Sequence, residues 1–264
     1  MVDYIELKSL FESLNLADKP VIVHASLKPF GYIQEGADAV VRAMISSFKS
    51  VIMPTFTYWT MVTPPLGPPN NAMIYARPES PNEMATSFTP DLCADPMLGV
   101  LPEALRNHSQ ATRSSHPILS FAGINADSIL GTQMLDDPFA PIGALTERDG
   151  WVVLINVDHT SNTSIHYAEK LTCRKQFIRW ALVGDRTVEC RNYPGDSSGF
   201  NAIKPHIQPE VLRENSGAAF VEAMPVKRLI DVAAELIRKD PFALLCQRTD
   251  CLTCNEVRGI HALG

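Results

Sequence analysis

Apolar residues in the first part of the chain follow two different spacings. Residues 20–26 form a short apolar run, rich in β-branched side chains, that follows a proline and ends in small polar residues. From residue 37 to residue 48, apolar side chains recur at the spacing of one helix face, and a second short apolar run covers residues 51–56. This order predicts a strand, a helix and a second strand, joined as a right-handed parallel crossover.

Residues 58–90 break this regularity, because they are rich in proline and asparagine. Proline removes a backbone donor and fixes φ, so few regular elements are expected in this segment. A loop of this length inside a compact domain is typical of a lid or binding segment, with a disordered linker as the alternative. We therefore interpret residues 58–90 as a long loop over a site.

The rest of the chain has shorter patterns, which predict further elements. Helices are expected at residues 97–108, 142–148 and 226–238, and strands at residues 118–122, 151–157, 177–183 and 186–190. The last two strands would form a hairpin, followed by an irregular stretch through Pro205. The sequence contains no internal repeat and no clear interdomain linker. We predict one α/β domain over residues 1–264, with a central, largely parallel sheet flanked by helices and an irregular C-terminal third.

Composition limits the classes of function. The chain has 264 residues, 45% of them hydrophobic and 20% charged, without the 18 consecutive apolar residues that a membrane span needs. Its net charge of −6 argues against a broad nucleic-acid surface and is compatible with a small cationic substrate. Acidic residues stand near the N-terminus, where a secretory signal would carry basic ones, so we expect a cytoplasmic location. The oligomeric state is left open.

One pair of residues indicates proton-transfer chemistry. His166 and Glu169 stand three residues apart, in a helix expected directly after the strand at residues 151–157 and the polar turn at residues 158–162. This spacing can place both side chains on one helix face, and a carboxylate beside an imidazole orients the ring as a general base. Ligands usually bind at this edge of open α/β sheets. A surface pair is the alternative.

Two other motifs have weaker support. Residues 195–199 fit the G-x-S-x-G pattern of a hydrolase nucleophile, Ser197, but Pro194 precedes the motif and Pro205 follows it, so neither a core strand nor a helix flanks it. A plain turn is favoured there. Cys246, Cys251 and Cys254 have the spacing C-x4-C-x2-C, and His261 could complete a structural zinc site. Half of a zinc knuckle is missing, so free or partly buried thiols are favoured and no metal is assigned.

Four segments, in order along the chain, resemble the antibiotic N-acetyltransferase family typified by aminoglycoside 3-N-acetyltransferase. His24-Ala25-Ser26-Leu27, followed by Gly31, resembles the family's H-x-S-L opening, and residues 53–57 resemble the end of its second strand. Residues 113–117, Arg-Ser-Ser-His-Pro, resemble its R-S-x-H-P segment, and residues 162–169 its N-T-S-x-H-x-A-E segment. Together the matches cover about residues 20–170. The chain has neither a P-loop nor a dinucleotide fingerprint, and it lacks the pyrophosphate loop of the common acetyltransferase (GNAT) scaffold.

The resemblance implies transfer of an acetyl group from acetyl-CoA to an amine by direct attack, without an acyl-enzyme. In this family His166 would be the catalytic base, and Glu169 would orient it or help bind the amine. The coenzyme contacts that carry over are Ser26, Leu27, Gly31, Thr55, Arg113, Ser114, Ser115 and His116. The implied acceptor is a cationic aminoglycoside, modified at its 3-amino group, with antibiotic resistance as the consequence.

The acceptor side departs from the family pattern. Ala140 replaces a glycine in the segment at residues 137–143, and Asn156 stands where glycine is usual. Carboxylates of Glu83, Asp137 and Asp158 could bind substrate ammonium groups, or could be solvated charges or helix caps. The alternatives are an acetyltransferase of the same family that acts on another amine, a serine hydrolase that uses Ser197, and a non-catalytic CoA-binding relative.

Overall fold

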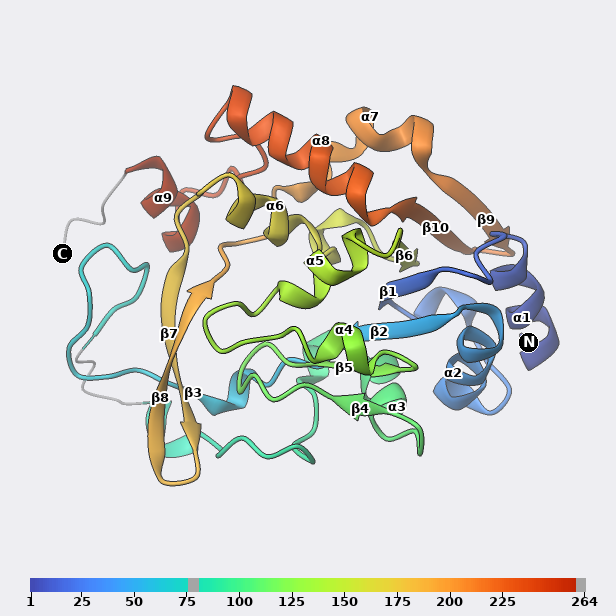
Figure 1. Cartoon of the computed structure of the whole chain (residues 1–264), viewed down its shortest axis with the longest axis horizontal. Coiled ribbons are helices and arrows are strands. Elements are labelled where there is room, and N and C mark those ends of the chain that lie inside the picture. The colour runs from blue at the N-terminus through green and yellow to red at the C-terminus, as the bar shows by residue number, and fades with distance from the viewer. Residues whose placement is uncertain (76–80, 260–264) are drawn as a thin grey trace.

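A mixed sheet of seven strands forms the centre of the part that the computed structural model describes, residues 1–75 and 81–259 (Figure 1). The strands lie in the order β4 (Thr112–Arg113), β5 (Phe121–Ile124), β2 (Ser50–Pro54), β1 (Pro20–Ala25), β6 (Trp151–Ile155), β10 (Ala219–Pro225) and β9 (Leu212–Ser216). β1 pairs in parallel with both β2 and β6, and the pairs outside this centre are antiparallel. The predicted α/β fold is confirmed, and so is the parallel pairing of the first two predicted strands.

The central strands are buried on both faces, which explains their continuous apolar runs. Because successive side chains point to opposite faces, alternate residues of one strand join different cores. Ile22 and Val152 lie in one core, whereas Val21 and Val153 lie in the other. The central sheet therefore has one hydrophobic core on each of its two faces.

Helices cover both faces (Figure 1). The helices α1 (Tyr4–Glu12), α2 (Gly36–Ser47) and α3 (Val100–Arg106) pack in one core. The opposite core contains α4 (Asp127–Leu130), α5 (Ala140–Thr146), α6 (Ile165–Leu171), α7 (Lys204–Ile207) and α8 (Val226–Lys239). α9 (Leu252–Arg258) lies near the C-terminus and packs in a small separate cluster with buried cysteines.

A second sheet, of three strands, stands beside the main one. It contains β3 (Met61–Val62), β7 (Phe177–Val183) and β8 (Arg186–Tyr193), and the β7–β8 hairpin confirms the prediction for this segment. The proline-rich segment packs along this hairpin. Asn71 exchanges two hydrogen bonds with the backbone of Ile178, at 2.8 and 3.0 Å, and Phe88 N donates to Leu182 O at 2.8 Å. The segment is mostly irregular, as predicted, except for β3 and two short 3₁₀ turns, at Tyr58–Thr60 and Pro81–Met84.

Several element boundaries differ from the sequence-based expectation. The strand expected at residues 118–122 begins only at Phe121, because Nδ1 of His116 accepts hydrogen bonds from the amides of Ile118 and Leu119 and so holds these residues in a turn. The C-terminal third is more regular than predicted, since β9 and β10 extend the main sheet there. α1 was also not predicted; a capping box of Asp3 and Glu6 starts it.

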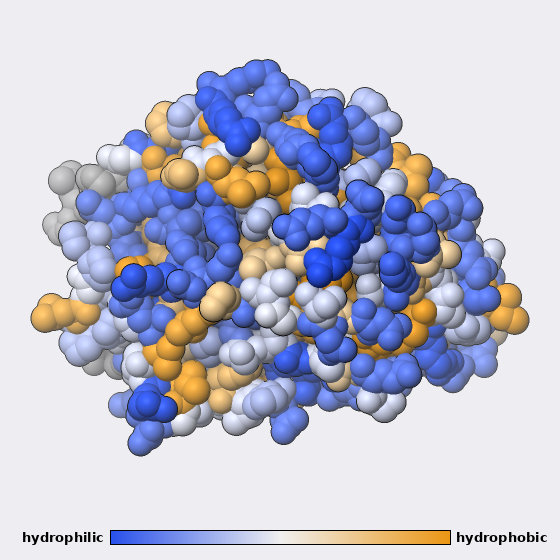
Figure 2. Space-filling model, in the orientation of Figure 1, coloured by the Kyte–Doolittle hydropathy of each residue, from blue (hydrophilic) through white to orange (hydrophobic). Residues whose placement is uncertain are grey.

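The surface view shows mostly hydrophilic residues with scattered hydrophobic patches (Figure 2). Among the described residues, no helix has both the length and the apolar composition required to cross a bilayer.

Candidate active site

A cleft of about 740 Å³ opens where the three central parallel strands end. β1 leads into it through His24, Ser26 and Leu27, and β2 through Met53 and Pro54. Other lining residues lie before α5, after β6, in α6, at the end of β8 and in the segment that follows it; they include Phe139, Val157, Thr160, His166, Tyr193, Asp196 and Ser197. The site therefore lies at the carboxyl ends of the parallel strands, where open α/β sheets usually bind ligands.

His166 lies in α6 and lines this cleft. Its Nδ1 is 2.7 Å from Oε2 of Glu169, one helical turn further on, and both residues are buried. The imidazole packs against the rings of Phe139 and Phe200, with centroid distances of 5.6 and 4.8 Å. Because Nδ1 is engaged by the carboxylate, Nε2 is the nitrogen left for a substrate proton. The three-residue spacing in the sequence thus places the Glu169 carboxylate where it fixes the orientation of the His166 ring.

Glu169 has a second charged partner that the sequence did not suggest. Its Oε1 accepts a hydrogen bond from Nη1 of Arg174 at 3.0 Å, and both side chains are buried. Nη2 of Arg174 donates to the carbonyls of Pro241 and Ala243, at 2.9 and 2.7 Å. A buried carboxylate is costly unless it is paired, so the Arg174 guanidinium offsets part of the cost of burying Glu169 beside the imidazole. No local pattern could have revealed Arg174, because its carbonyl partners lie far away along the chain.

The other histidine of the cleft has a different environment. His24 is buried at the end of β1, and its Nε2 has no hydrogen-bond partner among the described residues. Burial, and then the charge of His159, lowers the pKa of His24 to about 3. Burial, with Lys204 as the next cause, lowers the pKa of His159 to about 4. Near neutral pH both rings are therefore uncharged.

Only part of the predicted coenzyme set lines the cleft. Ser26 and Leu27 do, and the Ser26 backbone is fixed by bonds from its N to Ile155 O at 2.8 Å and from Asn156 Nδ2 to its O at 3.0 Å. Gly31 ends a 3₁₀ turn with φ of +68°, and Thr55 is buried against Ser120. Neither lines the cleft.

The Arg113 to His116 segment is used to join parts of the scaffold. Arg113 donates to Ser120 Oγ and to the carbonyls of Thr55, Pro90 and Leu92, so it holds the segment around residues 90–92 to the end of β2. Burial, together with Arg106, lowers the pKa of Arg113 to about 10. None of the residues of this segment lines the cleft.

Ser114 and His116, in the same segment, form hydrogen bonds within the scaffold. Ser114 Oγ accepts from Phe121 N at 2.8 Å, and Ser115 is exposed. Burial lowers the pKa of His116 to about 4. The described contacts thus give Arg113, Ser114 and His116 a scaffold role.

The three predicted substrate acids also lie outside the lining of the cleft. Glu83 is exposed on a 3₁₀ turn, and Asp137 accepts from Lys170 Nζ at 2.5 Å. Asp158 caps the turn before α6 through Thr160 and also accepts from Asn201 at 2.6 Å. Burial raises the pKa of the Asp158 carboxyl, but the hydrogen bonds from Thr160 and Asn201 outweigh it and bring that pKa below its usual value.

The backbone conformation explains why asparagine can stand at position 156, where the family usually has glycine. Asn156 adopts a positive φ of 54°, a conformation that asparagine tolerates better than most residues. Its side chain also joins two strands, donating to Ser26 O and accepting from Phe220 N at 2.7 Å. An asparagine can therefore replace the family's usual glycine at this turn.

The G-x-S-x-G segment forms neither a strand-to-helix turn nor a serine–imidazole pair. Ser197 Oγ donates to the carbonyl of Thr160 at 2.6 Å, and a 3₁₀ turn at Phe200–Ile203 follows. Gly199 is required for packing, because a Cβ there would lie 2.4 to 2.5 Å from backbone atoms of Leu244 and Leu245. The glycine thus lets the C-terminal segment approach the cleft-lining loop.

A sequence model of the family described as aminoglycoside 3-N-acetyltransferase matches residues 22–238. The chain belongs to this family.

Among curated proteins, the chain is 29% identical over 164 residues to an aminoglycoside N(3')-acetyltransferase-like protein, YokD, of Bacillus subtilis, covering 56% of this chain and 57% of that protein. It is 30% identical over 178 residues to aminoglycoside N(3)-acetyltransferase VII of Streptomyces paromomycinus, covering 60% and 57%. The match thus spans less than two thirds of these relatives.

Solved structures share the fold. Aminoglycoside acetyltransferase AAC(3)-IVa superposes with a TM-score of 0.78 at 19% identity, covering 98% of both chains. YokD from Bacillus subtilis superposes with a TM-score of 0.76 at 20% identity, covering 91% of this chain and 94% of that one. At these identities the likeness concerns the fold, and it agrees with a main sheet that is not closed into a barrel.

Proposed function

We propose that this protein transfers the acetyl group of acetyl-CoA to the 3-amino group of an aminoglycoside antibiotic, and so confers resistance. The observation that carries the proposal is the buried His166, held at Nδ1 by Glu169 and open to the cleft at the ends of the parallel strands. A relative of the same fold has been solved with CoASH bound, and others with gentamicin or sisomicin bound. Because acetyl-CoA is a cytoplasmic metabolite, the reaction takes place in the cytoplasm.

The chemistry needs one positioned base. The amine nitrogen attacks the thioester carbonyl, a C–N bond forms, and the C–S bond to coenzyme A breaks. His166 Nε2 takes the amine proton, and the departing thiolate takes up a proton in turn. Glu169 stabilises the imidazolium that forms, as the carboxylate does in serine-protease triads. Such a base typically contributes about 10² to 10⁴ in rate.

Two of the expected coenzyme contacts fit this reaction, Ser26 and Leu27. Their backbone lies at the end of β1 and lines the cleft. The net charge of −6 supports a cationic acceptor. We place the coenzyme thioester between this strand end and His166.

The test is release of the coenzyme A thiol from acetyl-CoA, measured with gentamicin, kanamycin and tobramycin as acceptors. We expect turnover with at least one of them, and acetylation at N3 in the NMR spectrum of the product. The His166→Ala protein should be folded by circular dichroism and inactive.

Three results would contradict parts of the proposal. Turnover with other amines alone would indicate an acetyltransferase of the same family with a different acceptor. Full activity of His166→Ala would remove this residue as the base. Ester hydrolysis that is lost in Ser197→Ala would favour a serine hydrolase.

A further inference from the structure

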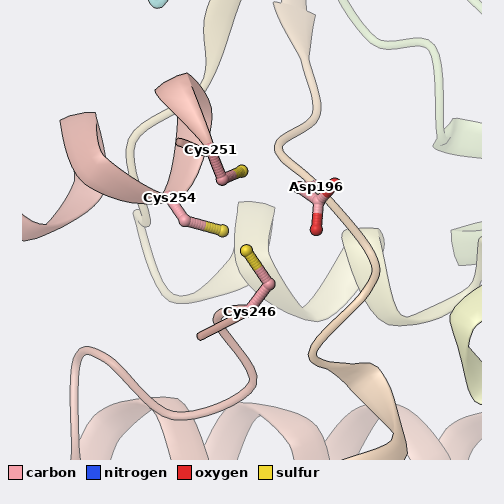
Figure 3. Close-up of side chains that lie close together, drawn as sticks. All are labelled: Asp196, Cys246, Cys251 and Cys254. Carbon is pink, nitrogen blue, oxygen red and sulfur yellow. The ribbon is translucent and has the colours of Figure 1, made fainter. Parts of the chain in front are cut away.

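Three cysteines that are dispersed along the C-terminal segment meet one aspartate from the loop after β8. Cys246 follows α8, Cys251 and Cys254 lie at the start of α9, and Asp196 belongs to the segment that lines the cleft. The four side chains point toward one another (Figure 3). One ligand atom from each lies within 4.8 Å of all the others. The fold thus gathers three sulfurs and a carboxylate oxygen around one point.

The distances fit a single tetrahedral ion. With Zn–S bonds of about 2.3 Å, tetrahedral geometry places the sulfurs about 3.8 Å apart, within the observed limit. The three cysteines are 3%, 4% and 1% exposed, and none of them forms a disulfide. Oδ1 of Asp196 accepts from Ser198 N at 2.9 Å, which orients the carboxylate and leaves Oδ2 for a ligand. Four protein ligands form the closed set of a structural site.

We propose that Cys246, Cys251, Cys254 and Asp196 bind one structural zinc ion. The spacing of the cysteines alone left the fourth ligand open, and His261, the residue considered for it, lies outside the described residues. Asp196 takes that place from a distant part of the chain, well before Cys246. On binding, each thiol gives its proton to solvent and coordinates as a thiolate.

Positive charge near the site supports an anionic metal complex. Three thiolates, one carboxylate and Zn²⁺ together carry a net charge of −2. Arg248 interacts electrostatically with Asp196, Cys246 and Cys251, and the Arg258 guanidinium donates to the carbonyl of Cys246. These cations reduce the cost of placing such a complex in a partly buried position.

The position of the site gives the zinc a mechanical role. It joins the cleft-lining loop to the C-terminal segment, the same segment whose Pro241 and Ala243 carbonyls accept from Arg174. Glu169, Arg174, Asp196 and Cys254 line one small pocket. The proposed metal site is therefore next to the ion pair of Glu169 and Arg174. Lys175 adds an ion pair to Glu256 of α9 at 2.8 Å. The zinc would therefore fix the backbone on which Arg174 depends.

The test measures metal and does not depend on the acetyltransferase reaction. Protein produced in zinc-supplemented medium and purified without chelator is analysed by mass spectrometry for metals. We expect one zinc per chain in the wild type and in the control Cys93→Ser, which removes an exposed thiol elsewhere. Cys254→Ser and Asp196→Asn should lose zinc on dialysis. Replacement of zinc by Co²⁺ should give the intense thiolate-to-cobalt band and the visible spectrum of a tetrahedral site.

Two results would overturn the proposal. One is a wild-type chain that carries no stoichiometric zinc and shows no thiolate–cobalt band. The other is a peptide map that shows a disulfide between two of the three cysteines in freshly purified protein. If Cys254→Ser fails to fold, the cobalt spectra of the wild type and of Asp196→Asn still decide the question.

Discussion

Two histidines line the same cleft with different surroundings, and the difference supports His166, rather than His24, as the proposed base. His166 has a carboxylate on Nδ1, and that carboxylate has its own guanidinium partner. His24 is buried without any such partner, so burial keeps its pKa far below neutrality. Residue type and burial are the same in both, so we expect base function to depend on the carboxylate that contacts Nδ1. Four experiments test this difference.

The largest effect is expected from His166→Ala. Loss of the base should lower kcat by about 10² to 10⁴ at saturating acetyl-CoA, because proton removal then depends on solvent. Thiol release gives the rate, and urea unfolding checks that the fold survives. A matched His24→Ala protein should lose far less; an equal loss in both would contradict the assigned difference.

Glu169→Gln tests the carboxylate behind His166. A charge-assisted hydrogen bond is worth about 1.5 to 3 kcal/mol, so its loss should lower kcat by about 10- to 100-fold. The substitution also leaves Arg174 without a charged partner, and the free energy of unfolding should fall. A kcat equal to that of wild type, in a protein of normal stability, would remove Glu169 from the mechanism.

The third experiment uses pH and the histidines whose pKa values burial lowers: His24 to about 3, and His116 and His159 to about 4. Between about pH 6.5 and about pH 4 these rings bind protons in the unfolded chain but not in the folded one. Their contribution to stability is therefore full above about pH 6.5 and falls as the pH falls, by up to about 1.4 kcal/mol per pH unit for each histidine.

Urea unfolding at neutral pH and at about pH 5 measures this slope. His116→Asn, whose amide oxygen can replace Nδ1 as acceptor, should reduce it by about one histidine's share. His206→Gln, at an exposed position of α7, is the control with which the slope of His116→Asn is compared. An unchanged slope in His116→Asn would contradict a neutral, buried ring.

The smallest effect is expected from Ser197→Ala. Its hydroxyl only donates to the Thr160 carbonyl, so kcat should stay near that of wild type while the free energy of unfolding falls by about 0.5 to 1.5 kcal/mol. Acetyl transfer and denaturant unfolding measure the two quantities. A loss of transfer as large as that in Glu169→Gln would show that the polar loop takes part in the reaction.

Much of the fold could be predicted because its core elements carry their own periodicity. The strands at residues 20–25 and 151–155 are continuous apolar runs, and α2 has one apolar face. β9 could not be predicted, because its exposed or half-buried residues at the sheet edge give no apolar pattern. The start of β5 was misplaced because a side chain, His116, takes the backbone donors that a strand would use.

The site, too, contains residues that the sequence predicted and one that it did not. His166 and Glu169 were found because one helical turn brings them together, so their relation is local in the sequence. Arg174 was missed because its role depends on carbonyls brought close only by folding. The residues 113–116 fit the family motif, but the guanidinium donors of Arg113 are taken by a hydroxyl and by carbonyls of the scaffold. A motif gives residue identity, whereas the free hydrogen-bonding capacity of a side chain depends on tertiary contacts.

The carbonyls of Pro241 and Ala243, which accept hydrogen bonds from Arg174, also limit how far the C-terminus can be truncated. The family match ends at residue 238, yet Pro241 and Ala243 lie beyond it. A fragment trimmed to the family boundary would keep His166 and Glu169, the pair proposed for catalysis, and would lose the carbonyls that hold Arg174. We therefore expect premature stop codons after α8, or fusions that displace residues 241–243, to weaken the support of the proposed base although they change no residue of the cleft.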